Sequence, residues 1–522
     1  MILDKRRAGV LLHLTSLPCK YGYGALNREA MNFVDFLAEC KLSLWQMLPI
    51  HPTHGLSHPD FLSPYQCQSV HAGNPLLISL QVLADQEIVT RNRPRFKFPE
   101  DSKQLTEYRY ESLKVAYHYF CNFCKDTTTV IDHHKFTRFQ EENKQWLEDY
   151  ALFRVLKEKF EHRPWWEWDK AYRDKDPQAL AQIQQECQSQ LEQQYYEQFL
   201  FFQQWDRLKN YANNRGVYLV GDMPFFVAED SVEMWVYRDN FLLNDQGRAK
   251  YFAGTNPQDD YFKPGEGQCW KLPVYNWDHM ETNNFQWWIQ RFNTMSCLFD
   301  MVRLAHFRGY VRTWAIPSET SDPKDGFWLP AHGEKMFERL KKEWQHPIPL
   351  MVDDIGVEKK RERDVYDLWH EKFRVEDGSG KIQSKMFGMK VLQLGFTKGD
   401  LRNLHLPHHY TPNRVAYTGT YDSDTTLGWL NHLGENRKFV FDYFNIHEQD
   451  EVMSVLIRYV IQSPAYFAII PMQDILRLDG EHRMNTPGEV DGCWQWQFQW
   501  TQLTNPMKSE LRKLVEWYQR SV

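Results

Sequence analysis

The sequence predicts an α/β fold, a (β/α)8 TIM barrel with a large, mostly helical insertion between its second and third strands. Three observations support this prediction. Eight short, nearly continuous apolar runs recur along the 522 residues. Several of these runs are separated by segments with the period of an amphipathic helix. One long polar interval interrupts the series after the second run. Strands that are covered on both faces and alternate with helices are typical of a parallel barrel.

The predicted strands lie in the runs 8–14, 44–50, 217–223, 299–305, 349–355, 390–396, 414–420 and 466–472. Their apolarity is continuous and does not alternate, which favours strands buried on both faces. Helical patterns between them include 30–40, 333–344 and 451–461, where apolar residues return every three or four positions.

The long interval is polar, charged and aromatic, with helix-period stretches such as 178–195. We therefore predict that 1–84 forms the first part of the barrel, 85–215 an inserted, mostly helical subdomain, and 216–522 the remainder of the barrel. Within the last part, 254–277 is rich in Gly and Pro and irregular in pattern. This composition predicts a long active-site loop over the mouth of the barrel.

The composition excludes several classes of function. The net charge is −7 without a basic stripe, which argues against a nucleic-acid partner. No apolar run approaches the roughly 18 residues of a membrane span, so we expect no membrane partner. Scattered cysteines and the lack of a cleavable leader pattern predict a cytoplasmic protein with reduced thiols. No phosphate-binding glycine loop or paired C-x-x-C occurs, so we expect no cofactor and no metal site.

Acidic side chains gather where the predicted strands end, which is the end of a barrel that carries chemistry. The strand ends present Asp222, Ala305 with His306 and Arg308, Asp353 with Asp354, Asp422 with Asp424, and Gln473 with Asp474. Glycoside chemistry needs such a set, because one carboxyl attacks or stabilises the anomeric carbon and another protonates the leaving oxygen. Any single Asp could instead cap the following helix. The 20 Trp residues are mostly core, but aromatic faces also suit sugar rings.

The segment R-L-A-H-F-R-G at 303–309 is the most informative of these strand ends. Two arginines and a histidine surround Ala305, which has no functional group. Cationic side chains in such a setting usually hold an anion. A carboxylate would therefore be expected where Ala305 stands.

Motifs spread along nearly the whole chain carry a family resemblance. They are R-A-G-V-L-L-H-L-T-S-L-P (7–18), W-Q-M-L-P (45–49), S-P-Y-Q (63–66), A-G-N-P-L-L-I-S-L (72–80), G-D-M-P-F-F-V-A-E-D-S (221–231), G-M-K-V-L-Q (388–393), Y-T-G-T (417–420), D-T-T-L-G-W (424–429) and R-M-N-T-P-G (483–488). The chain resembles the 4-α-glucanotransferases of the amylomaltase, or disproportionating enzyme, family, which are relatives of the α-amylases.

The resemblance implies a retaining mechanism that disproportionates α-1,4-glucans and maltooligosaccharides. In this family an Asp nucleophile forms a covalent glucosyl-enzyme, a Glu acts as acid and then base, and a second Asp stabilises the distorted sugar. A sugar 4-hydroxyl replaces water as the acceptor. The nucleophile position is Ala305, the acid/base position is Asp353, and the transition-state stabiliser is Asp422. The implied substrate-binding residues are Tyr65, Asp222, Gln268, Trp270, Arg303, His306 and Tyr421, of which Tyr65 and Arg303 match residues that hold the −1 sugar.

The chain departs from the family pattern around this subsite. The family has Asp at 305 and Glu at 353. It has His and Asn where this chain has Tyr421 and Ser423, and W-G-N-P where this chain has W-K-L-P at 270–273. Alanine cannot form a glycosyl ester, and loss of a covalent nucleophile costs on the order of 10⁴-fold in rate. Asp353 is one methylene shorter than Glu, and a misplacement of about 1 Å can cost roughly 10²-fold.

Three hypotheses follow for the function. The chain is a 4-α-glucanotransferase that uses another carboxylate or a shifted register, or it is a catalytically impaired α-glucan-binding pseudoenzyme, or it is an engineered nucleophile knockout. A knockout would change one residue in an intact site, whereas several residues differ here, which favours natural divergence. Ala305 favours impaired catalysis over ordinary turnover.

Overall fold

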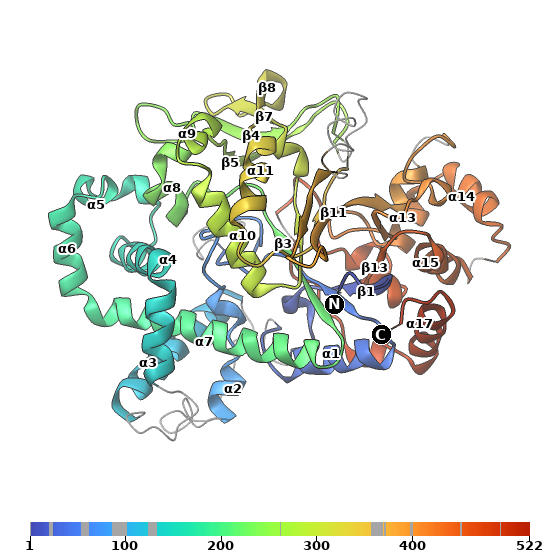
Figure 1. The fold of residues 1–522 in the computed structure, drawn as a ribbon, viewed down its shortest axis with the longest axis horizontal. Helices are drawn as coiled ribbons and strands as arrows, with labels where there is room; N and C mark the ends of the chain where they lie inside the picture. The colour runs from blue at the N-terminus through green and yellow to red at the C-terminus, as the bar shows by residue number, and fades with distance from the viewer. Residues whose placement is uncertain are drawn as a thin grey trace.

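A computed structural model shows the eight predicted strands in one closed parallel barrel (Figure 1). The structure describes residues 2–19, 24–53, 62–85, 102–123, 133–260, 263–355, 369, 372–396, 400–448, 451–490 and 492–521. The barrel strands are β1 (Arg7–Leu11), β2 (Leu44–Gln46), β3 (Tyr218–Met223), β6 (Met301–Leu304), β9 (Leu350–Val352), β11 (Ile382–Val391), β12 (Arg414–Tyr417) and β13 (Phe467–Pro471). Their order around the barrel is that of the chain, and the ring closes because β1 pairs with β13 and β9 pairs with both β6 and β11. This arrangement confirms the predicted fold class.

The predicted bounds of the sixth strand are wrong. The strand spans Ile382–Val391, while 392–396 forms the 3-10 helix η7 (Leu392–Phe396). The first half of β11 is only half buried and extends beyond the barrel to pair with the short antiparallel strand β10 (Arg374–Glu376). Because Gln383, Ser384 and Lys385 make this half polar, a search for continuous apolar runs does not find it.

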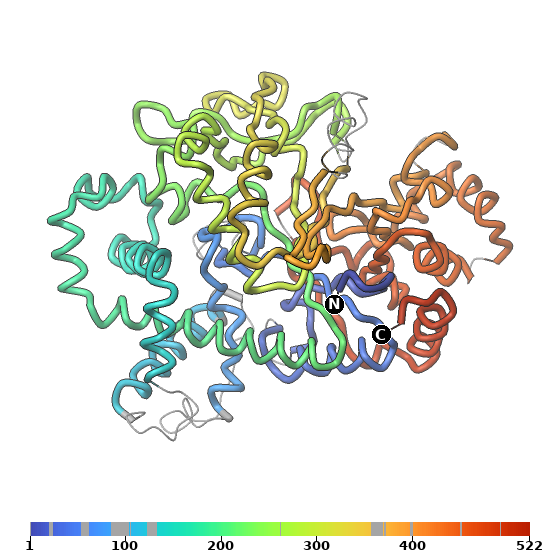
Figure 2. Tube along the Cα trace, viewed as in Figure 1, coloured from blue at the N-terminus to red at the C-terminus, as the bar shows by residue number. Residues whose placement is uncertain are grey.

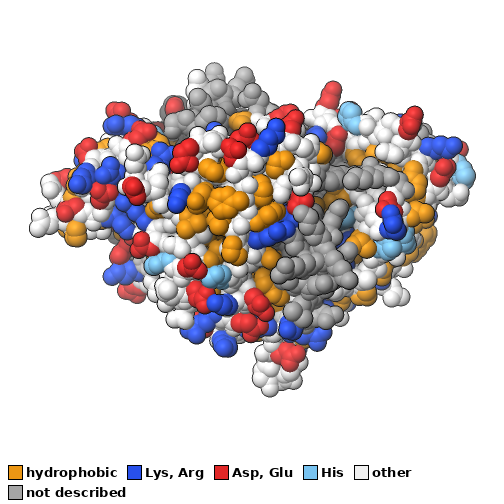
Figure 3. Space-filling model, turned by 90° about the horizontal axis from the view of Figure 1, so that it is seen from above, with side chains coloured by type: hydrophobic (Ala, Val, Ile, Leu, Met, Phe, Trp, Pro, Cys, Tyr) orange, Lys and Arg blue, Asp and Glu red, His pale blue; other side chains and the backbone are white. Residues whose placement is uncertain are grey.

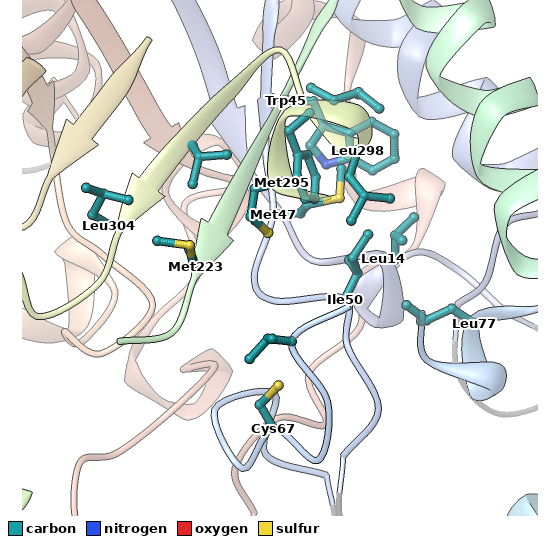
Figure 4. Packing of buried hydrophobic residues seen from close by; sticks show 14 of the residues in the cluster. Leu14, Trp45, Met47, Ile50, Cys67, Leu77, Met223, Met295, Leu298 and Leu304 are labelled. Atoms are coloured by element: carbon teal, nitrogen blue, oxygen red, sulfur yellow. The ribbon is translucent and has the colours of Figure 1, made fainter. Parts of the chain in front are cut away.

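Alternate residues of the strands fill the interior of the barrel. Leu11, Leu44, Val220, Met301, Met351, Val415, Tyr417, Phe467 and Ile469 belong to one buried cluster, distinct from the larger cluster that packs beneath the helices. Figure 4 shows part of the larger cluster, where Trp45 and Met47 lie close to Met295 and Leu298. The two-residue period of a strand therefore determines which side chains point into the barrel and which point outward.

Helices cover the outside of the barrel. They include α1 (Arg28–Glu39), α10 (Gln286–Leu298), α11 (Gly333–Glu343), α13 (Thr426–His432), α14 (Asn436–Phe444), α15 (Val452–Gln462) and α17 (Asn505–Trp517), with the short helices α8 (Val232–Val236), α9 (Trp277–Thr282) and α16 (Met472–Ile475). The helices predicted at 30–40, 333–344 and 451–461 correspond to α1, α11 and α15. None of the described helices is long and apolar enough to cross a membrane.

The insertion between β2 and β3 is helical and forms the lobe at the left of Figure 1. Its helices are α2 (Leu80–Asp85), α3 (Ser102–Phe123), α4 (His133–Lys159), α5 (Lys170–Arg173), α6 (Pro177–Glu186) and α7 (Gln188–Asn213). The helical stretch predicted at 178–195 is interrupted at Cys187, which ends α6 and begins α7. The boundaries at 84/85 and 215/216 stay predictions.

A second, four-stranded antiparallel sheet lies above the barrel at the top of Figure 1. Figure 3 shows the molecule from that side, where an apolar patch is surrounded by charged side chains of both signs. Its order is β5 (Gln268–Pro273), β4 (Tyr251–Thr255), β7 (Arg312–Pro317) and β8 (Phe327–Pro330). Segment 254–277 is therefore more regular than predicted, since it contains β5 and the ends of β4 and α9. Gly254 is needed for the close approach of two strands, because a Cβ there would lie 2.0 Å from the carbonyl oxygen of Gln268. Gly254 serves this pairing, whereas Gly265 and Gly267 lie between the two strands with φ values of 83° and 72°, in the region that favours glycine.

The two ends of the chain meet at the amino-terminal side of the barrel (Figure 2). The buried Arg520 guanidinium donates hydrogen bonds to the carbonyl oxygens of Arg7, Ile461, Ser463, Ala465 and Tyr466. This contact ties the end of the chain to β1 and β13 and satisfies carbonyl groups that would otherwise be buried without donors.

Candidate active site

The inward-facing positions of three neighbouring strands carry charge at their carboxyl ends. Arg303 lies two residues after the inward-facing Met301, Asp222 two after Val220, and Asp353 two after Met351, so all three side chains point into the barrel axis. Strand register places Asp222 opposite Arg303. The two-residue spacing along each strand and the register between strands therefore bring these charged side chains together.

Arg303 is the centre of a buried ion network. Its Nη1 lies 2.6 Å from Asp222 Oδ2, and its Nη2 lies 2.5 Å from Asp353 Oδ2. Nη1 also donates to the hydroxyl of Tyr421 at 3.1 Å. Burial raises the pKa of both Asp222 and Asp353, and the Arg303 charge opposes that rise. One cation thus holds two carboxylates in a water-poor site.

An aromatic wall stands beside this network. The rings of Tyr65 and Tyr421 stack with centroids 5.3 Å apart and an interplanar angle of 22°. Trp494 packs against both, at 5.8 Å from Tyr65 and 6.2 Å from Tyr421. The Tyr65 hydroxyl donates to Asp222 Oδ2 at 2.9 Å. The hydrogen bond and the stacking fix the orientation of Tyr65.

Asp422 lies on the loop after β12 and is oriented by another loop. Asn485 Nδ2 donates to Asp422 Oδ1 at 2.7 Å, and Arg483 donates to the Asp422 carbonyl oxygen at 3.1 Å. Burial raises the pKa of Asp422 to about 6, although the Asn485 amide and the Arg303 charge act in the opposite direction.

The raised pKa of Asp422 predicts a pH-dependent stability. An acid whose pKa is higher in the folded state, about 6 here, than in the unfolded chain binds more protons when folded, so stability falls as pH rises from about 4 to about 6. We expect the stability of the natural chain relative to Asp422→Asn to fall by about 2 kcal/mol over this range and to stay level above it. Urea unfolding of both proteins at pH 4.5, 5.5, 6.5 and 7.5 measures this difference. A difference that does not change with pH would contradict the prediction.

Ala305 follows β6 and lines the cleft over the barrel. Its backbone N–H donates to the carbonyl oxygen of Met223 at 3.1 Å, which continues the pairing of β6 with β3. The position is therefore well defined by the backbone, while its side chain is a methyl group. The carboxylates that line the same cleft include Asp353, Asp422 and Asp259, and Asp259 pairs with Arg308 at 3.1 Å.

His306 is half-buried and neutral. Burial, with Arg308 and Arg303 nearby, lowers its pKa to about 3. Its backbone adopts the left-handed region at φ 47°, which is uncommon for a residue with a side chain and turns the chain sharply after β6. The imidazole packs edge-on against Trp270, with centroids 4.9 Å apart. A neutral imidazole can donate or accept a hydrogen bond but supplies no positive charge.

Gln268 and Trp270 reach the cleft from β5 of the small sheet. Gln268 Nε2 donates to Asp260 Oδ2 at 2.9 Å, and Trp270 Nε1 donates to Gln268 Oε1 at 3.2 Å. This chain of hydrogen bonds holds the Trp270 ring against His306. The predicted residues on segment 254–277 thus lie over the barrel mouth, as expected for the segment, but on a strand.

One cleft of about 1430 Å³ runs over the carboxyl ends of the strands. It is lined by Tyr65, Gln268, Trp270, Arg303, Ala305, His306, Asp353, Tyr421 and Asp422. Asp222 is fully buried beneath its floor and touches it through Tyr65 and Arg303. The structure therefore brings all the sequence-predicted site residues to one place.

Two other acids at strand ends have structural partners. Asp474 accepts hydrogen bonds from Thr418 and from both the backbone N–H and the hydroxyl of Thr426. Asp354 accepts from the backbone N–H of Met389 and pairs with Arg414 at 3.1 Å. Neither residue caps the helix that follows its own strand: Asp354 binds strand β11 and Arg414, and Asp474 lies within α16 and binds the first turn of α13.

Sequence reasoning missed Asn485 and Trp494. Both lie after η10 (Gly480–His482), which follows β13 and α16, and they contact Asp422 and Tyr65 across long sequence separations. Asn485 lies inside the R-M-N-T-P-G motif, which is the one signal that could have identified it. No group of three or more His, Cys, Asp or Glu side chains within the described ranges is placed to hold a metal ion.

The closed parallel barrel and its cleft of carboxylates and aromatic rings define a class, the (β/α)8 proteins whose sites suit sugar chemistry. A family model described as 4-alpha-glucanotransferase, glycoside hydrolase family 77, matches residues 12–504. The chain belongs to this family, which confirms the resemblance that its motifs indicate.

The chain is similar over its full length to curated relatives and to a solved structure. It is 36% identical over 529 residues to the 4-alpha-glucanotransferase of Synechocystis sp., covering 100% of this chain and 99% of the relative. It is 37% identical over 520 residues to that of Thermus thermophilus, covering 98% of each. The amylomaltase of Streptococcus agalactiae, solved in complex with acarbose, superposes with a TM-score of 0.88 at 31% identity, covering 99% of this chain and 100% of that one. The amylomaltase of Corynebacterium glutamicum, at 14% identity and a TM-score of 0.73, shares the fold; the alignment covers 98% of this chain and 75% of that one.

Proposed function

We propose that this chain binds α-1,4-glucan in the cleft and does not form the covalent glucosyl-enzyme of its family, so that its transglycosylation is severely impaired. One observation carries the proposal. Position 305, at the carboxyl end of β6, holds a methyl group on the wall of the cleft. Alanine offers no lone pair to the anomeric carbon, so the first displacement has no nucleophile there.

The remaining carboxylates have other partners. Asp222 and Asp353 both pair with Arg303, and Asp422 accepts from Asn485. A retaining mechanism needs a nucleophile and a separate acid about 5–5.5 Å apart. In the proposed assignment, Asp353 takes the acid/base position with a side chain that is one methylene short, and Asp422 takes the stabilising position.

Glucan binding rests on the shape and the lining of the cleft. A volume of about 1430 Å³ exceeds that of a site for one small ligand, and it suits an oligomer. The rings of Tyr65, Trp270 and Trp494 present flat apolar faces beside carboxylates and amides. Sugars match this combination, since their ring faces are apolar and their hydroxyls form hydrogen bonds.

A second candidate function is slow transglycosylation through the remaining acids. Burial raises the pKa of Asp422 to about 6, while Asp353 faces the Arg303 cation. Two carboxyl groups with different environments can divide the roles of proton donor and anion. This observation favours residual turnover over complete inactivity.

Two assays on the natural chain test the proposal. In the first, calorimetric titration with maltooligosaccharides should detect binding. In the second, incubation with maltotriose should release glucose and longer oligomers at least about 10⁴-fold more slowly than the similar enzyme of Thermus thermophilus under matched conditions. Turnover at a rate comparable to that enzyme would contradict the impairment, and absence of binding would contradict the glucan-binding function.

A further inference from the structure

One arm of the cleft is built by the helical insertion and carries an aromatic platform. Trp166 lies in η3 (Trp165–Glu167), after α4, and its half-buried ring lines the same cavity as Ala305 and Asp353. The ring packs edge-on against the buried Trp165, with centroids 5.8 Å apart. Trp165 itself does not line the cleft, so this contact supports the Trp166 ring from outside the cavity.

Arg248 fixes one face of this ring. Its guanidinium carbon lies 3.8 Å from the centroid of Trp166, and the guanidinium binds Glu229 in a bidentate pair at 2.9 and 2.8 Å. Glu229 also accepts from the backbone N–H of Ala249 at 3.0 Å. The indole N–H of Trp165 donates to the carbonyl oxygen of Glu229 at 2.8 Å. Two separate segments therefore lock the platform in one orientation before any ligand arrives.

The charges around the platform favour an uncharged ligand. Lys157 pairs with Asp230 at 2.6 Å, and Arg248 pairs with Glu229 at 2.8 Å. The exposed side chains of Glu161 and Arg163, which also line this arm, have opposite signs. The exposed Gln246 supplies an uncharged donor and acceptor beside them.

We propose that Trp166, with Arg248 stacked on one of its faces, is a distal carbohydrate subsite that takes an uncharged glucan chain extending from the barrel mouth onto the insertion. The cleft thereby selects long chains over short ones. The inference rests on the proposed function, because it adds a second contact to the same glucan. Continuity supports it, since one cavity of about 1430 Å³ includes both Trp166 and the end of β6.

The test compares Trp166→Ala with the natural chain by calorimetric titration of maltotriose and maltoheptaose. The natural chain should bind maltoheptaose more tightly than maltotriose. In Trp166→Ala the affinity for maltoheptaose should fall roughly tenfold, because the loss of a stacking face removes on the order of 1 kcal/mol or more. This variant should then bind maltoheptaose no more tightly than maltotriose. Trp166→Tyr, which keeps an aromatic ring of smaller face, should lose roughly threefold.

Trp517 on α17 provides the matched control, because its side chain is 64% exposed and lies outside the cleft lining. Trp517→Ala should bind both sugars like the natural chain. Equal maltoheptaose affinities in the natural chain, Trp166→Ala and Trp166→Tyr would overturn the distal subsite while leaving the proposed function intact. Failure of the natural chain to bind either sugar would overturn both. Thermal unfolding of each variant shows whether it is folded. If Trp166→Ala does not fold, the maltoheptaose affinity of Trp166→Tyr tests the distal subsite.

Discussion

The double variant Ala305→Asp, Asp353→Glu is expected to disproportionate maltotriose at least about 10³-fold faster than the natural chain. The first change supplies a carboxylate at the carboxyl end of β6, at a position whose backbone is held by its hydrogen bond to Met223. The second lengthens the acid by one methylene, which restores about 1 Å of reach toward the glycosidic oxygen. Chromatography of glucose and longer oligomers measures the gain.

Single variants separate the two contributions. Ala305→Asp alone should recover most of the gain, because a missing nucleophile costs on the order of 10⁴-fold and a short acid roughly 10²-fold. Asp353→Glu alone should recover little, since it adds reach without a nucleophile. No gain in the double variant would locate the defect in Tyr421 and Lys271, which also depart from the family pattern.

Arg303→Met is expected to destabilise the fold by about 3–5 kcal/mol. The substitution leaves Asp222, which is fully buried, and Asp353 without the cation that both contact. Removing one partner of a buried ion network costs more than the network itself contributes, because the remaining charges stay desolvated. Urea unfolding at pH 7 measures the change.

Two further variants serve as a control and as a partial rescue for Arg303→Met. Arg402→Met removes an exposed arginine that pairs with Asp400, and it should change stability by no more than about 0.5 kcal/mol. Asp222→Asn in the Arg303→Met background should recover part of the loss, because it removes one uncompensated charge. A cost below about 1 kcal/mol for Arg303→Met would contradict the view that Arg303 holds the site together.

The sequence predicts the barrel well where burial is uniform. Seven strands lie inside the predicted apolar runs or within one residue of them, because strands covered on both faces leave continuous apolar sequence. β11 departs from this rule, since its first half is only partly covered and mostly polar. The four-stranded sheet of β5, β4, β7 and β8 was not predicted for a related reason. Its strands are short, one of them contains Gly254, and Gly265 and Gly267 lie between β4 and β5, so the segment has the composition of a loop.

The part of the candidate site that lies on barrel strands could be predicted from the sequence, whereas contacts made by loops could not. Asp222, Arg303 and Asp353 share the inward parity of their strands, so counting from apolar neighbours places them at the rim. Contacts such as Asn485 with Asp422 depend on loop paths that no local period encodes. Trp166 is still harder to predict, because it reaches the cleft from the insertion. No periodic pattern in the sequence indicates how the insertion packs on the barrel.

The central claim is that the natural chain forms no covalent glycosyl-enzyme, and the most direct test is to look for this intermediate. Intact-protein mass spectrometry after incubation with α-maltotriosyl fluoride reports whether a glucosyl ester forms. The natural chain should keep its unmodified mass, because position 305 has no carboxylate, while Ala305→Asp should gain the mass of one maltotriosyl group. An adduct on the natural chain would mean that another residue serves as nucleophile, and would contradict the account.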